Sequence, residues 1–558
     1  MARVLIVGGV AGGASAAARL RRLNENIEII MLDKGPYVSW ANCGLPYYIG
    51  KVIRNRGALE LVTPTRFRVR FNIDARVDHE VLSIDRENKT VQIQDLIREE
   101  EYKMAYDYLI LSPGAAAIKP PFPGSDEVPL FLLRTISDAE TIKDYVDENT
   151  LQHAVIIGGG FIGLEMVENL SKRGVKVTIV EMLDQVMPPL DREMAQFIHK
   201  ELIMNDISLV LEDLVDSFGR TNEDKPYIKT KGGRIIETDL IVLCIGVKPE
   251  TKLAREANLK LGPKGHIIVN KYMQTSDPSI YAVGDAVQVL NLQTKQPTAI
   301  PLAGPANKQG RIAADNICGR KTEYKGILGA FVLKLFDMTI TSVGLSEKDL
   351  KKTSIQFEKI YLHPSNHASY YPGARPMAFK LIFDKSSGKI LGAQIVGGPG
   401  SEKRIDIISA IIKKDGTVFD LEELELTYAP PYSSAKDPVN MAGFIAANVV
   451  RNDYAVWHWH DLDTIKQKNG FLLDVRTPLE HKLGTIEGAI NINDLKFRDH
   501  LNEIPKDRAI YTFCATGYRS YLTTRILLQH GYKEVYNLSG GMVTYQTATA
   551  TLEEFKNT

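Results

Sequence analysis

Residues 154–174 read AVIIGGGFIGLEMVENLSKRG, and residues 175–181 continue as VKVTIVE. An apolar run, a glycine-rich turn, a helical segment and a second apolar run, in that order, are typical of a βαβ unit with parallel strands. The turn from Gly158 to Gly163 carries glycine at its first, third and sixth positions, the fingerprint of a dinucleotide-binding fold. Such a turn brings a helix N-terminus against a pyrophosphate, so this stretch predicts a doubly wound α/β domain.

The same pattern stands at the N-terminus, where RVLIV leads into the turn Gly8 to Gly13 and then into the run IEIIMLD. The third position of this turn is Val10, which departs from the fingerprint. Asp33 ends the second run, at the place where a carboxylate binds ribose hydroxyls. Glu181 holds the matching place in the second unit, where a carboxylate repels a 2′-phosphate and should favour NADH over NADPH.

Composition restricts the class of protein. The 558 residues suggest roughly four domains. The 44% hydrophobic and 24% charged residues are ordinary for globular proteins and argue against disordered or fibrous chains. Lys+Arg and Asp+Glu both number 68, which argues against a dedicated nucleic-acid or membrane-surface binder. No apolar run is long enough for a membrane span, and we expect no signal peptide.

The four cysteines, Cys43, Cys244, Cys318 and Cys514, are far apart in the sequence. They form neither a disulfide framework nor a zinc ligand set, so we expect a cytoplasmic protein without a metal site. Cys244 and Cys318 are predicted to be structural, because one lies in an apolar strand pattern and the other follows an amphipathic helix.

The sequence changes character after residue 329. Residues 377–398, MAFKLIFDKSSGKILGAQIVGG, predict two antiparallel strands joined by a Ser-Ser-Gly turn. Residues 428–440, YAPPYSSAKDPVN, predict a constrained loop. Beyond a predicted linker, GFLLDVR at 470–476 and AIYTFCATG at 509–517 predict a small α/β module with a helix after Gly517.

The segment TSDPSIYAVGD, residues 275–285, identifies the larger part of the chain. With it the chain resembles the FAD-dependent pyridine nucleotide–disulfide oxidoreductases over residues 1–448. The resemblance implies an FAD-binding domain at 1–115 and 246–328, an NAD-binding domain at 116–245, a dimerisation domain at 329–448 and a homodimer, with Asp285 on the ribitol of FAD. It implies cofactor contacts at Gly8, Val10, Ala11, Gly12, Gly13, Asp33, Lys34, Asn42, Cys43, Ser112, Gly114, Gly158, Gly160, Phe161, Ile162, Gly163, Glu181, Gly246, Gly284 and Asp285.

That superfamily usually carries a CxxxxC disulfide, whereas residues 39–48 here read SWANCGLPYY with Cys43 alone. This motif resembles the coenzyme A-disulfide reductase branch, in which the lone cysteine lies beside the flavin and forms a mixed disulfide with the substrate. The other interpretation of Cys43 is a buried apolar thiol. The branch implies coenzyme A contacts at Ser15, Arg19, Arg22, Ser39, Asn42 and Lys436, although Arg19 and Arg22 alone would be taken as a solvated helix face.

Two tyrosine positions are also implied by the branch. Tyr428, in YAPPYSSAKDP, resembles an active-site tyrosine that is donated across the dimer, and its companion is either Tyr370 or Tyr371 in HASYYPG. A tyrosine hydroxyl can hydrogen-bond a sulfur anion or protonate a leaving thiolate. The other interpretation is a set of core tyrosines with satisfied hydroxyls.

The last module, 449–558 with a linker at 449–459, resembles a rhodanese domain. Asp474-Val475-Arg476 and Glu480 fit its first half, and Cys514-Ala515-Thr516-Gly517-Tyr518-Arg519-Ser520 fits CxxGxRS. Such a loop points backbone N–H groups at the sulfur, and Arg519 adds positive charge, so it favours a thiolate and a persulfide anion. His458 and His460 in the linker are predicted to form an interdomain contact.

Together these features predict an FAD- and NADH-dependent reductase of coenzyme A disulfide, coenzyme A persulfide or polysulfide. Its rhodanese domain would carry sulfane sulfur, taken from polysulfide or thiosulfate, on Cys514. One alternative is an NADH oxidase or peroxidase whose cysteine cycles through sulfenic acid. Those relatives carry a histidine in the first glycine-rich turn, where Ala11 stands here. A second alternative is a non-enzymatic redox-sensing flavoprotein.

Overall fold

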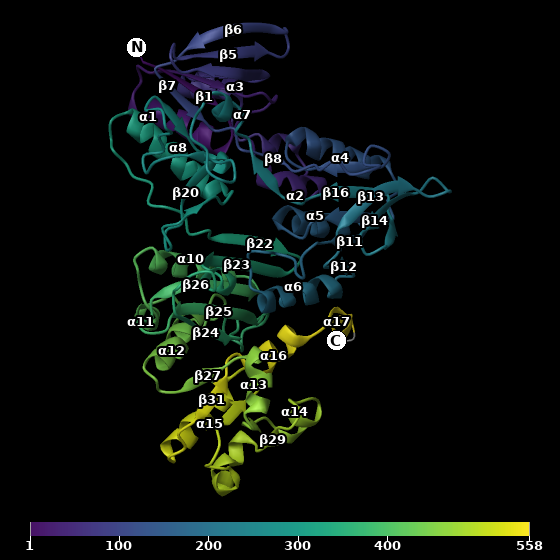
Figure 1. Ribbon diagram of the computed structural model, residues 1–558, viewed down its shortest axis with the longest axis vertical. Helices are drawn as coiled ribbons and strands as arrows, with labels where there is room; N and C mark the ends of the chain where they lie inside the picture. Colours follow the sequence, from purple (N-terminus) through teal and green to yellow (C-terminus); the bar gives the residue numbers. More distant parts are fainter. Residues whose placement is uncertain (1, 557–558) are drawn as a thin grey trace. The chain divides into compact units, whose positions relative to one another are not determined.

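The computed structural model describes residues 2–556 and divides into two compact units (Figure 1). One unit comprises residues 1–180 and 213–329, and the other comprises residues 181–212 and 330–558. Both contain sheets covered by helices, which confirms the predicted α/β fold class. Within residues 2–556, no helix has the length and apolar character needed to cross a membrane.

A parallel sheet forms the core of the N-terminal dinucleotide fold. Its strand order is β19-β7-β1-β2-β3, and its bounds are β1 Arg3–Val7, β2 Glu28–Leu32, β3 Asp74–Arg76, β7 Tyr108–Leu111 and β19 Ile280–Ala282. Helix α1 (Ala11–Leu23) follows β1 and packs against α8 (Ala303–Ile317). The two helices approach closely, since a Cβ on Gly310 would lie 2.2 Å from the Gly12 carbonyl oxygen. The predicted buried parallel strands are therefore confirmed.

The second dinucleotide fold repeats this arrangement with parallel neighbours in the order β11-β10-β16-β9. Their bounds are β9 Leu130–Leu132, β10 His153–Ile157, β11 Lys176–Val180 and β16 Leu240–Leu243, with helices α4 Ile136–Glu148 and α5 Phe161–Ser171. Two antiparallel sheets flank the folds, β4 His79–Asp85, β5 Thr90–Asp95 and β6 Glu100–Ala105, and β13 Val215–Arg220, β14 Pro226–Thr230 and β15 Ile235–Glu237.

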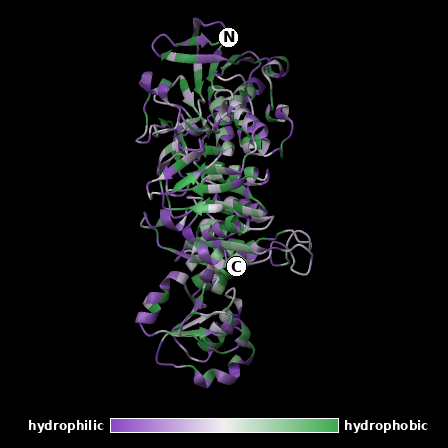
Figure 2. Ribbon diagram, turned by 90° about the vertical axis from the view of Figure 1, so that its right-hand side faces the viewer, coloured by the Kyte–Doolittle hydropathy of each residue, from purple (hydrophilic) through white to green (hydrophobic). Residues whose placement is uncertain are grey.

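The second unit is built first around an antiparallel sheet in the order β22-β23-β26-β25-β24. The bounds are β22 Phe331–Leu335, β23 Met338–Gly344, β24 Phe357–Leu362, β25 Met377–Asp384 and β26 Ile390–Gly397. Helices α6 Arg192–Met204, α10 Ser401–Ile412, α11 Val418–Glu423 and α12 Pro438–Val450 belong to this unit. The β25–β26 pair confirms the two strands predicted in residues 377–398. The strands are largely hydrophobic, while the helices mix hydrophobic and hydrophilic residues (Figure 2).

The C-terminal part is a parallel sheet in the order β27-β31-β30-β28-β29. The bounds are β27 Ala455–Trp457, β28 Phe471–Asp474, β29 Ile490–Asn491, β30 Ile510–Phe513 and β31 Val535–Leu538, with α14 Pro478–Lys482, α15 Tyr518–Gln529 and α16 Gly541–Thr549. Helix α15 confirms the helix predicted after Gly517. Strand β27 lies inside the predicted linker. This stretch belongs to the module, because Trp457 is buried and its Nε1 donates to the Thr512 carbonyl oxygen at 3.1 Å.

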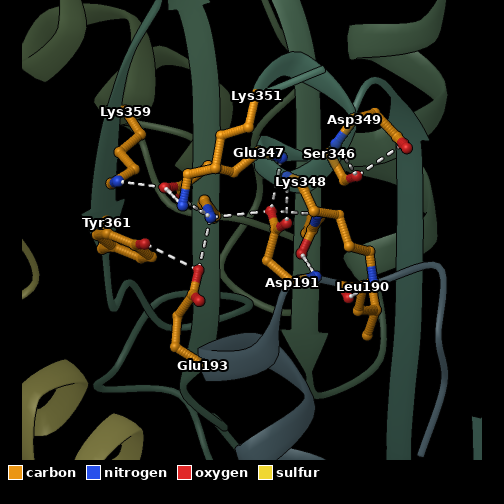
Figure 3. Close-up of polar contacts among 12 residues, drawn as sticks. Leu190, Asp191, Glu193, Ser346, Glu347, Lys348, Asp349, Lys351, Lys359 and Tyr361 are labelled. Atoms are coloured by element: carbon orange, nitrogen blue, oxygen red, sulfur yellow. Dashed lines mark hydrogen bonds and ion pairs between the residues drawn. The ribbon is translucent and has the colours of Figure 1, made fainter. Parts of the chain in front are cut away.

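A fully buried lysine joins α6 to the antiparallel sheet. Figure 3 shows its acidic neighbours Asp191, Glu193 and Glu347. Lys380 Nζ lies 2.8 Å from Asp191 Oδ2, 2.6 Å from Glu193 Oε1 and 2.9 Å from Glu347 Oε2. The three carboxylates converge as if to hold a cation, and the ammonium group of Lys380 lies among them. Since Asp191 and Glu193 stand at the start of α6, this charge cluster fixes the helix to β25.

The cluster continues toward the C-terminal module. Lys359 Nζ contacts Glu347 Oε1 at 2.8 Å and His460 Nε2 at 3.1 Å. His458 Nε2 lies 2.9 Å from Glu358 Oε1, and the rings of His458 and His460 stack. Glu358 and Lys359 belong to β24, so the predicted interdomain contact of the two histidines is confirmed.

Candidate functional site

The first glycine-rich turn has the close approaches that its sequence predicts. Gly8 has φ +92°, and a Cβ there would lie 2.1 Å from the Ser112 carbonyl oxygen. A Cβ on Gly13 would lie 1.9 Å from the Gly8 carbonyl oxygen, so only glycine allows α1 to begin this close to β1. Val10 has φ −95°, a value that any residue adopts. The departure at Val10 therefore leaves the turn intact.

Asp33 stands at the end of β2 with both carboxylate oxygens engaged. Oδ2 accepts from the Gly9 N–H at 2.8 Å and Oδ1 accepts from the Gly35 N–H at 2.9 Å. Burial raises the pKa of Asp33, and the two backbone hydrogen bonds oppose that rise. These contacts hold the carboxylate beside the glycine-rich turn, which fits a ribose of the FAD adenosine half.

Asp285 lies on a 3₁₀ turn, Gly284–Ala286, directly after β19. The Gly284 N–H donates to Gln309 Oε1 at 2.8 Å, and Arg134 NH2 lies 3.8 Å from Asp285 Oδ2. Burial raises the pKa of Asp285, while Arg134 lowers it. Neither Gln309 nor Arg134 was singled out from the sequence, because neither belongs to a motif and only the tertiary fold brings them to Asp285.

The second glycine-rich turn leaves room for a ligand. A Cβ on Gly158 would lie 2.5 Å from the Cys244 carbonyl oxygen, and one on Gly163 would lie 2.0 Å from the Gly158 carbonyl oxygen. In contrast, a Cβ on Gly160 would meet no atom within 4 Å. The turn is thus closely packed at Gly158 and Gly163 and open at Gly160, next to the N-terminus of α5. This open position fits a pyrophosphate.

Cys43 lies on a short 3₁₀ turn, Asn42–Gly44, that leads into α2 (Leu45–Ile49). Its side chain is exposed, and Sγ lies 3.9 Å from Asn42 Oδ1. The alternative of a buried apolar thiol is therefore wrong. Ser39 has the left-handed value φ +48°, and its N–H donates to the Gly9 carbonyl oxygen at 2.7 Å. This bond ties the cysteine loop to the first glycine-rich turn.

The cysteine loop is set into the surrounding protein although the sulfur is open to solvent. Desolvation raises the pKa of the Cys43 thiol, and the charges of Glu165 and Asp285 raise it further, while Arg134 lowers it. Cys43 therefore lies within electrostatic reach of Asp285. The fold brings the predicted redox cysteine and the predicted ribitol-binding aspartate into one site.

The predicted coenzyme A contacts on α1 differ in their exposure and in their polar partners. Arg19 Nε lies 2.7 Å from Asp315 Oδ1 on α8, and Ser15 Oγ lies 2.5 Å from Asn307 Oδ1. Arg22 is exposed. Of the two arginines, Arg22 presents its guanidinium to solvent, whereas Arg19 is ion-paired inside the α1–α8 contact.

In the second unit, the structure distinguishes Tyr370 from Tyr371. The hydroxyl oxygens of Tyr370 and Tyr428 are 2.6 Å apart. The ring of Tyr371 instead packs edge-on against His367, with ring centroids 5.7 Å apart. Tyr370 and Tyr428 are both exposed, so the alternative of core tyrosines is wrong for this pair.

A buried network positions the loop that carries Tyr428. Arg404 NH2 lies 2.9 Å from Asp437 Oδ2, and Ser433 Oγ donates to the same oxygen at 2.5 Å. The Ala368 N–H donates to the Ser433 carbonyl oxygen at 3.0 Å, which links this loop to the HASYYPG segment. The sequence predicted a constrained loop but not Arg404, which lies on α10, 33 residues before Asp437.

Cys514 follows β30, and its sulfur is buried in a set of donors. The Gly517 N–H donates to Sγ at 3.2 Å and Ser520 Oγ donates at 3.3 Å. Gly517 has φ +97°, which lets the loop turn back over the sulfur before α15 begins. Of the several backbone donors that the sequence predicts at this sulfur, the structure shows the Gly517 N–H, and the Ser520 hydroxyl adds a side-chain donor.

Arg519 is held by an acidic partner. Its NH1 and NH2 donate to the two carboxylate oxygens of Glu480 at 2.9 and 2.6 Å. The hydrogen bond from Arg519 lowers the pKa of Glu480 to about 2. Arg519 therefore lies near Cys514 as half of a bidentate pair and not as an isolated cation.

A cavity of ≈ 250 Å³ lies between the Cys514 loop and α12. The loop contributes Thr516, Gly517 and Tyr518 to its wall, and the other side contributes Lys436 and Asn448. Lys436 is exposed. The structure thus places Lys436, one of the predicted coenzyme A contacts, beside the Cys514 loop.

Cys244 and Cys318 belong neither to the Cys43 loop nor to the Cys514 loop. Cys244 follows β16 and is only half-buried, not inside the strand as predicted, because β16 ends at Leu243. Burial raises the pKa of Cys244 to about 12. Cys318 caps the C-terminal end of α8, and burial raises the pKa of its thiol as well.

Comparison with known families identifies the class. A family model described as pyridine nucleotide-disulphide oxidoreductase matches residues 2–310, the model of its dimerisation domain matches residues 331–438, and a rhodanese-like domain model matches residues 456–548. The chain therefore belongs to the pyridine nucleotide-disulphide oxidoreductases and carries a rhodanese-like domain. Its cofactors are FAD and NADH, as predicted.

Three relatives show which members the chain resembles. The coenzyme A disulfide reductase of Staphylococcus aureus (strain JH9) is 37% identical over 447 residues, which is 80% of this chain and 100% of that protein. The structure of reduced Bacillus anthracis CoADR-RHD is 51% identical with a TM-score of 0.95, covering 98% of each chain. A NAD-dependent persulfide reductase from A. fulgidus is 36% identical with a TM-score of 0.90, covering 97% of this chain and 100% of the other.

Proposed function

We propose that this protein reduces coenzyme A disulfide and coenzyme A persulfide with NADH through Cys43, and that its rhodanese domain carries sulfane sulfur on Cys514. The observation that carries the proposal is the exposed, single Cys43 on a loop hydrogen-bonded to the FAD-binding turn, with Ser39 N 2.7 Å from the Gly9 carbonyl oxygen. The similarity to a coenzyme A disulfide reductase and to a persulfide reductase supports this substrate class.

The two dinucleotide folds would hold the cofactors at the contacts described above. The turn from Gly8 to Gly13, with Asp33 and Asp285, fits FAD. The turn from Gly158 to Gly163, with Glu181, fits NADH. When bound, FAD passes the two electrons of the NADH hydride to a sulfur–sulfur bond. The protein supplies the sulfur nucleophile, its position and the protons.

Cys43 is the proposed nucleophile. Its thiolate attacks one sulfur of coenzyme A disulfide, so that a Cys43–coenzyme A disulfide forms and one coenzyme A thiolate leaves. Two electrons then break this mixed disulfide and return the Cys43 thiolate and a second coenzyme A thiolate. Overall, one disulfide, one NADH and one proton give two coenzyme A thiols and NAD⁺. The exposed sulfur of Cys43 suits an attack on a large substrate.

Tyr370 and Tyr428 are proposed to assist the leaving thiolate. Their hydroxyls form one hydrogen-bonded pair on the protein surface, so one O–H remains available to a sulfur anion. We infer that they act across a homodimer on the Cys43 of the other subunit, which is what the family dimerisation domain supports. A fully active enzyme with the mass of one chain in light scattering would contradict this arrangement.

The rhodanese domain would load sulfur. The Cys514 thiolate attacks the outer sulfur of thiosulfate, giving a Cys514 persulfide and releasing sulfite; polysulfide is the other proposed donor. The persulfide then passes its outer sulfur to a coenzyme A thiolate, which restores Cys514 and yields coenzyme A persulfide for reduction at Cys43. The donors at Cys514 Sγ support a persulfide anion, and the cavity beside Lys436 offers space for a thiol chain.

The proposal is tested by NADH oxidation with coenzyme A disulfide, coenzyme A persulfide and polysulfide measured side by side. Cys43→Ser should abolish all three reactions while FAD stays bound and thiosulfate sulfurtransfer persists. Cys514→Ser should keep the two coenzyme A reactions and slow the reduction of polysulfide. Turnover of Cys43→Ser at the wild-type rate would overturn the reductase mechanism. Equal losses of Cys514→Ser on all substrates would overturn the sulfur-loading role.

The two alternative functions predict different outcomes of the NADH assay. NADH consumption without any sulfur acceptor would favour the oxidase alternative, and binding without turnover would favour the redox sensor. We also propose a cytoplasmic location, which suits four cysteines that are all free in the structure.

A further inference from the structure

The loop around Cys514 is held at both of its ends, by different kinds of group. At its start, the carbonyl oxygens of Cys514 and Ala515 accept from backbone N–H groups in the first turn of α16 at 2.8 and 3.0 Å. At its end, the Gly517 carbonyl oxygen accepts from two side chains, Asn537 Nδ2 at 3.1 Å and Ser520 Oγ at 3.3 Å. Ser520 follows the loop directly, so Asn537 holds the far end of the loop from outside.

Asn537 is fixed by the sheet beneath the loop. It lies on β31 in register with Thr512 of β30, two residues before Cys514, and it is only 4% exposed. The end of β31 also packs against the loop backbone, since a Cβ on Gly517 would lie 3.4 Å from the Leu538 carbonyl oxygen. The contact between Asn537 and Gly517 is therefore part of the buried frame of the sulfur site and not a mobile surface contact.

Only one half of the Asn537 amide is used in this contact. The Gly517 carbonyl oxygen can only accept, so Nδ2 must face it and Oδ1 must point elsewhere. Among residues 2–556, Oδ1 is buried and has no hydrogen-bond partner. A buried acceptor without a partner destabilises a fold, and an apolar side chain of similar size would avoid that loss. Asparagine is thus a poor choice for packing alone, and its N–H donor is the group that the site uses.

We propose that Asn537 is a positioning residue of the sulfur site, which fixes Gly517 so that the Gly517 N–H points at Cys514 Sγ. That nitrogen lies 3.2 Å from the sulfur. Gly517 has φ +97° and ψ −14°, and a residue without a side chain rotates freely about its Cα. Anchoring its carbonyl group therefore also sets the direction of its N–H. The inference rests on the proposed sulfur-carrying role of Cys514 and deepens it.

The charge on the sulfur explains why the direction of this N–H should matter. The Cys514 thiolate attacks thiosulfate when the site is loaded. When the persulfide is discharged, the acceptor bonds to the outer sulfur, the sulfur–sulfur bond breaks and its electron pair returns to Sγ as a thiolate. If the Gly517 N–H turns away, Ser520 Oγ is the remaining donor to that anion among the groups described above. Both half-reactions should then slow, whereas reduction at Cys43 should not.

The test uses Asn537→Val in the FAD-loaded full chain. Valine is close to asparagine in size and is favoured in a strand, and it removes the donor and the unpaired oxygen together. Thiocyanate formation from thiosulfate and cyanide should be about tenfold slower, because a hydrogen bond to an anion is weakened. Thermal unfolding should show no lower midpoint, and coenzyme A disulfide should be reduced at the wild-type rate. A residue that only stabilised the fold would lower the unfolding midpoint together with the rate.

A second measurement needs no sulfur transfer. Iodoacetamide reacts with a thiolate, so alkylation of Cys514 at pH 7, followed by mass spectrometry, should also be slower in Asn537→Val. Thr524→Val is the matched control for both assays, because Thr524 is buried on α15 and its Oγ1 contacts Thr512 Oγ1 at 2.8 Å and not Gly517. Its rates should equal those of the wild type.

Wild-type rates in Asn537→Val would overturn the inference. Faster alkylation would overturn it as well, since it would show that Asn537 merely closes the loop over the sulfur. If Asn537→Val did not fold, Asn537→Ala would take its place and be judged by the same outcomes. Failure of the proposed function would be distinct: Cys514→Ser would still form thiocyanate, and the alkylation rates of Cys514 would still decide the role of Asn537.

Discussion

The hydroxyl oxygen of Tyr370 lies 2.6 Å from the hydroxyl oxygen of Tyr428, although 58 residues separate them in the sequence. The buried Arg404–Asp437 pair and the Ser433–Ala368 hydrogen bond hold the two segments together beneath these side chains. The hydrogen bond from Tyr370 raises the pKa of Tyr428. The two tyrosines therefore form one donor pair, and Tyr371 is outside it.

Removing one hydroxyl of this pair should slow reduction. We expect Tyr428→Phe to lower kcat for coenzyme A disulfide by about 10²-fold, as is typical when a proton donor is lost. Tyr370→Phe should have a smaller effect, because Tyr428 keeps its hydroxyl. Steady-state NADH oxidation measures both. Tyr371→Phe serves as the control, and its kcat should stay within about twofold of the wild-type value. A loss of kcat in Tyr371→Phe equal to that in Tyr428→Phe would show that the pairing of Tyr370 with Tyr428 is not the one that matters.

The same pair predicts a pH dependence. Because the pKa of Tyr428 is raised, its hydroxyl should remain protonated throughout the range from pH 7 to pH 9. If kcat of the wild type falls across this range, kcat of Tyr428→Phe should fall in the same way, because the fall does not come from Tyr428. A wild-type decline that this variant abolishes would show that the tyrosine ionises, contrary to the expectation.

Ser520 should matter to sulfur transfer and not to reduction of coenzyme A disulfide. Its hydroxyl donates to Cys514 Sγ at 3.3 Å, and a hydrogen bond to an anion is worth about 1.5 kcal/mol or more. Ser520→Ala should therefore slow thiosulfate sulfurtransfer about tenfold. Thr523→Ala, one turn further along α15, is the matched control, since the Thr523 hydroxyl donates to the Arg519 carbonyl oxygen and not to Cys514. Equal rates in both variants would remove Ser520 from the persulfide site.

Glu181 should set the choice of nicotinamide cofactor. Its carboxylate accepts from the Leu183 N–H at 2.9 Å, and we expect it to bind the ribose of the nicotinamide cofactor. We expect kcat/KM to be at least about tenfold higher with NADH than with NADPH, because a like charge repels the 2′-phosphate. Glu181→Gln should narrow this ratio mainly by improving NADPH. Comparable efficiency of the two cofactors in the wild type would contradict the assignment.

Lys380 should be essential for the stability of the second unit. Lys380→Met leaves Asp191, Glu193 and Glu347 buried without their common cation, and breaking such a cluster costs about 3–5 kcal/mol. Thermal unfolding monitored at pH 7 should show a clear drop in its midpoint. The control is Lys351→Met: Lys351 also pairs with Glu347, at 3.0 Å, but is exposed, so its loss should cost less than about 1 kcal/mol.

The pH dependence of this cluster follows from its pKa shifts. The pKa of Glu347 and that of Asp191 are lowered in the folded wild type, chiefly by Lys380 working against desolvation. Their contribution to stability is therefore present above the carboxyl pKa of the unfolded chain and is lost as the pH falls through the folded values. In Lys380→Met the carboxyl groups should protonate more easily, so the difference from the wild type should shrink between pH 7 and pH 5. A constant difference would contradict this account.

Much of the fold could be predicted because the decisive signals are local. The two glycine-rich turns, the acidic residues that end the second strands and the Cys514 loop each fit within about 30 residues, as a βαβ unit or a strand–loop–helix does. At Gly13 the backbone demand is met within the same stretch, because a Cβ there would collide with the Gly8 carbonyl oxygen. The boundary at β27 was missed because a three-residue edge strand has no periodicity to detect.

The sequence by itself determined the family, the cofactor folds and the two candidate sulfur centres, because motif residues adjacent in the chain must be adjacent in space. Only the tertiary structure decided which tyrosine pairs with Tyr428, that the Tyr47 hydroxyl bonds Glu165, and that Lys380 is buried among three carboxylates. Tyr370 and Tyr428 are 58 residues apart in the sequence, Tyr47 and Glu165 are 118 apart, and Lys380 is 33 to 189 residues away from its three carboxylates. Charge and hydrogen bonding act through distance in space, and burial sets their strength, so neither can be read from positions along a chain.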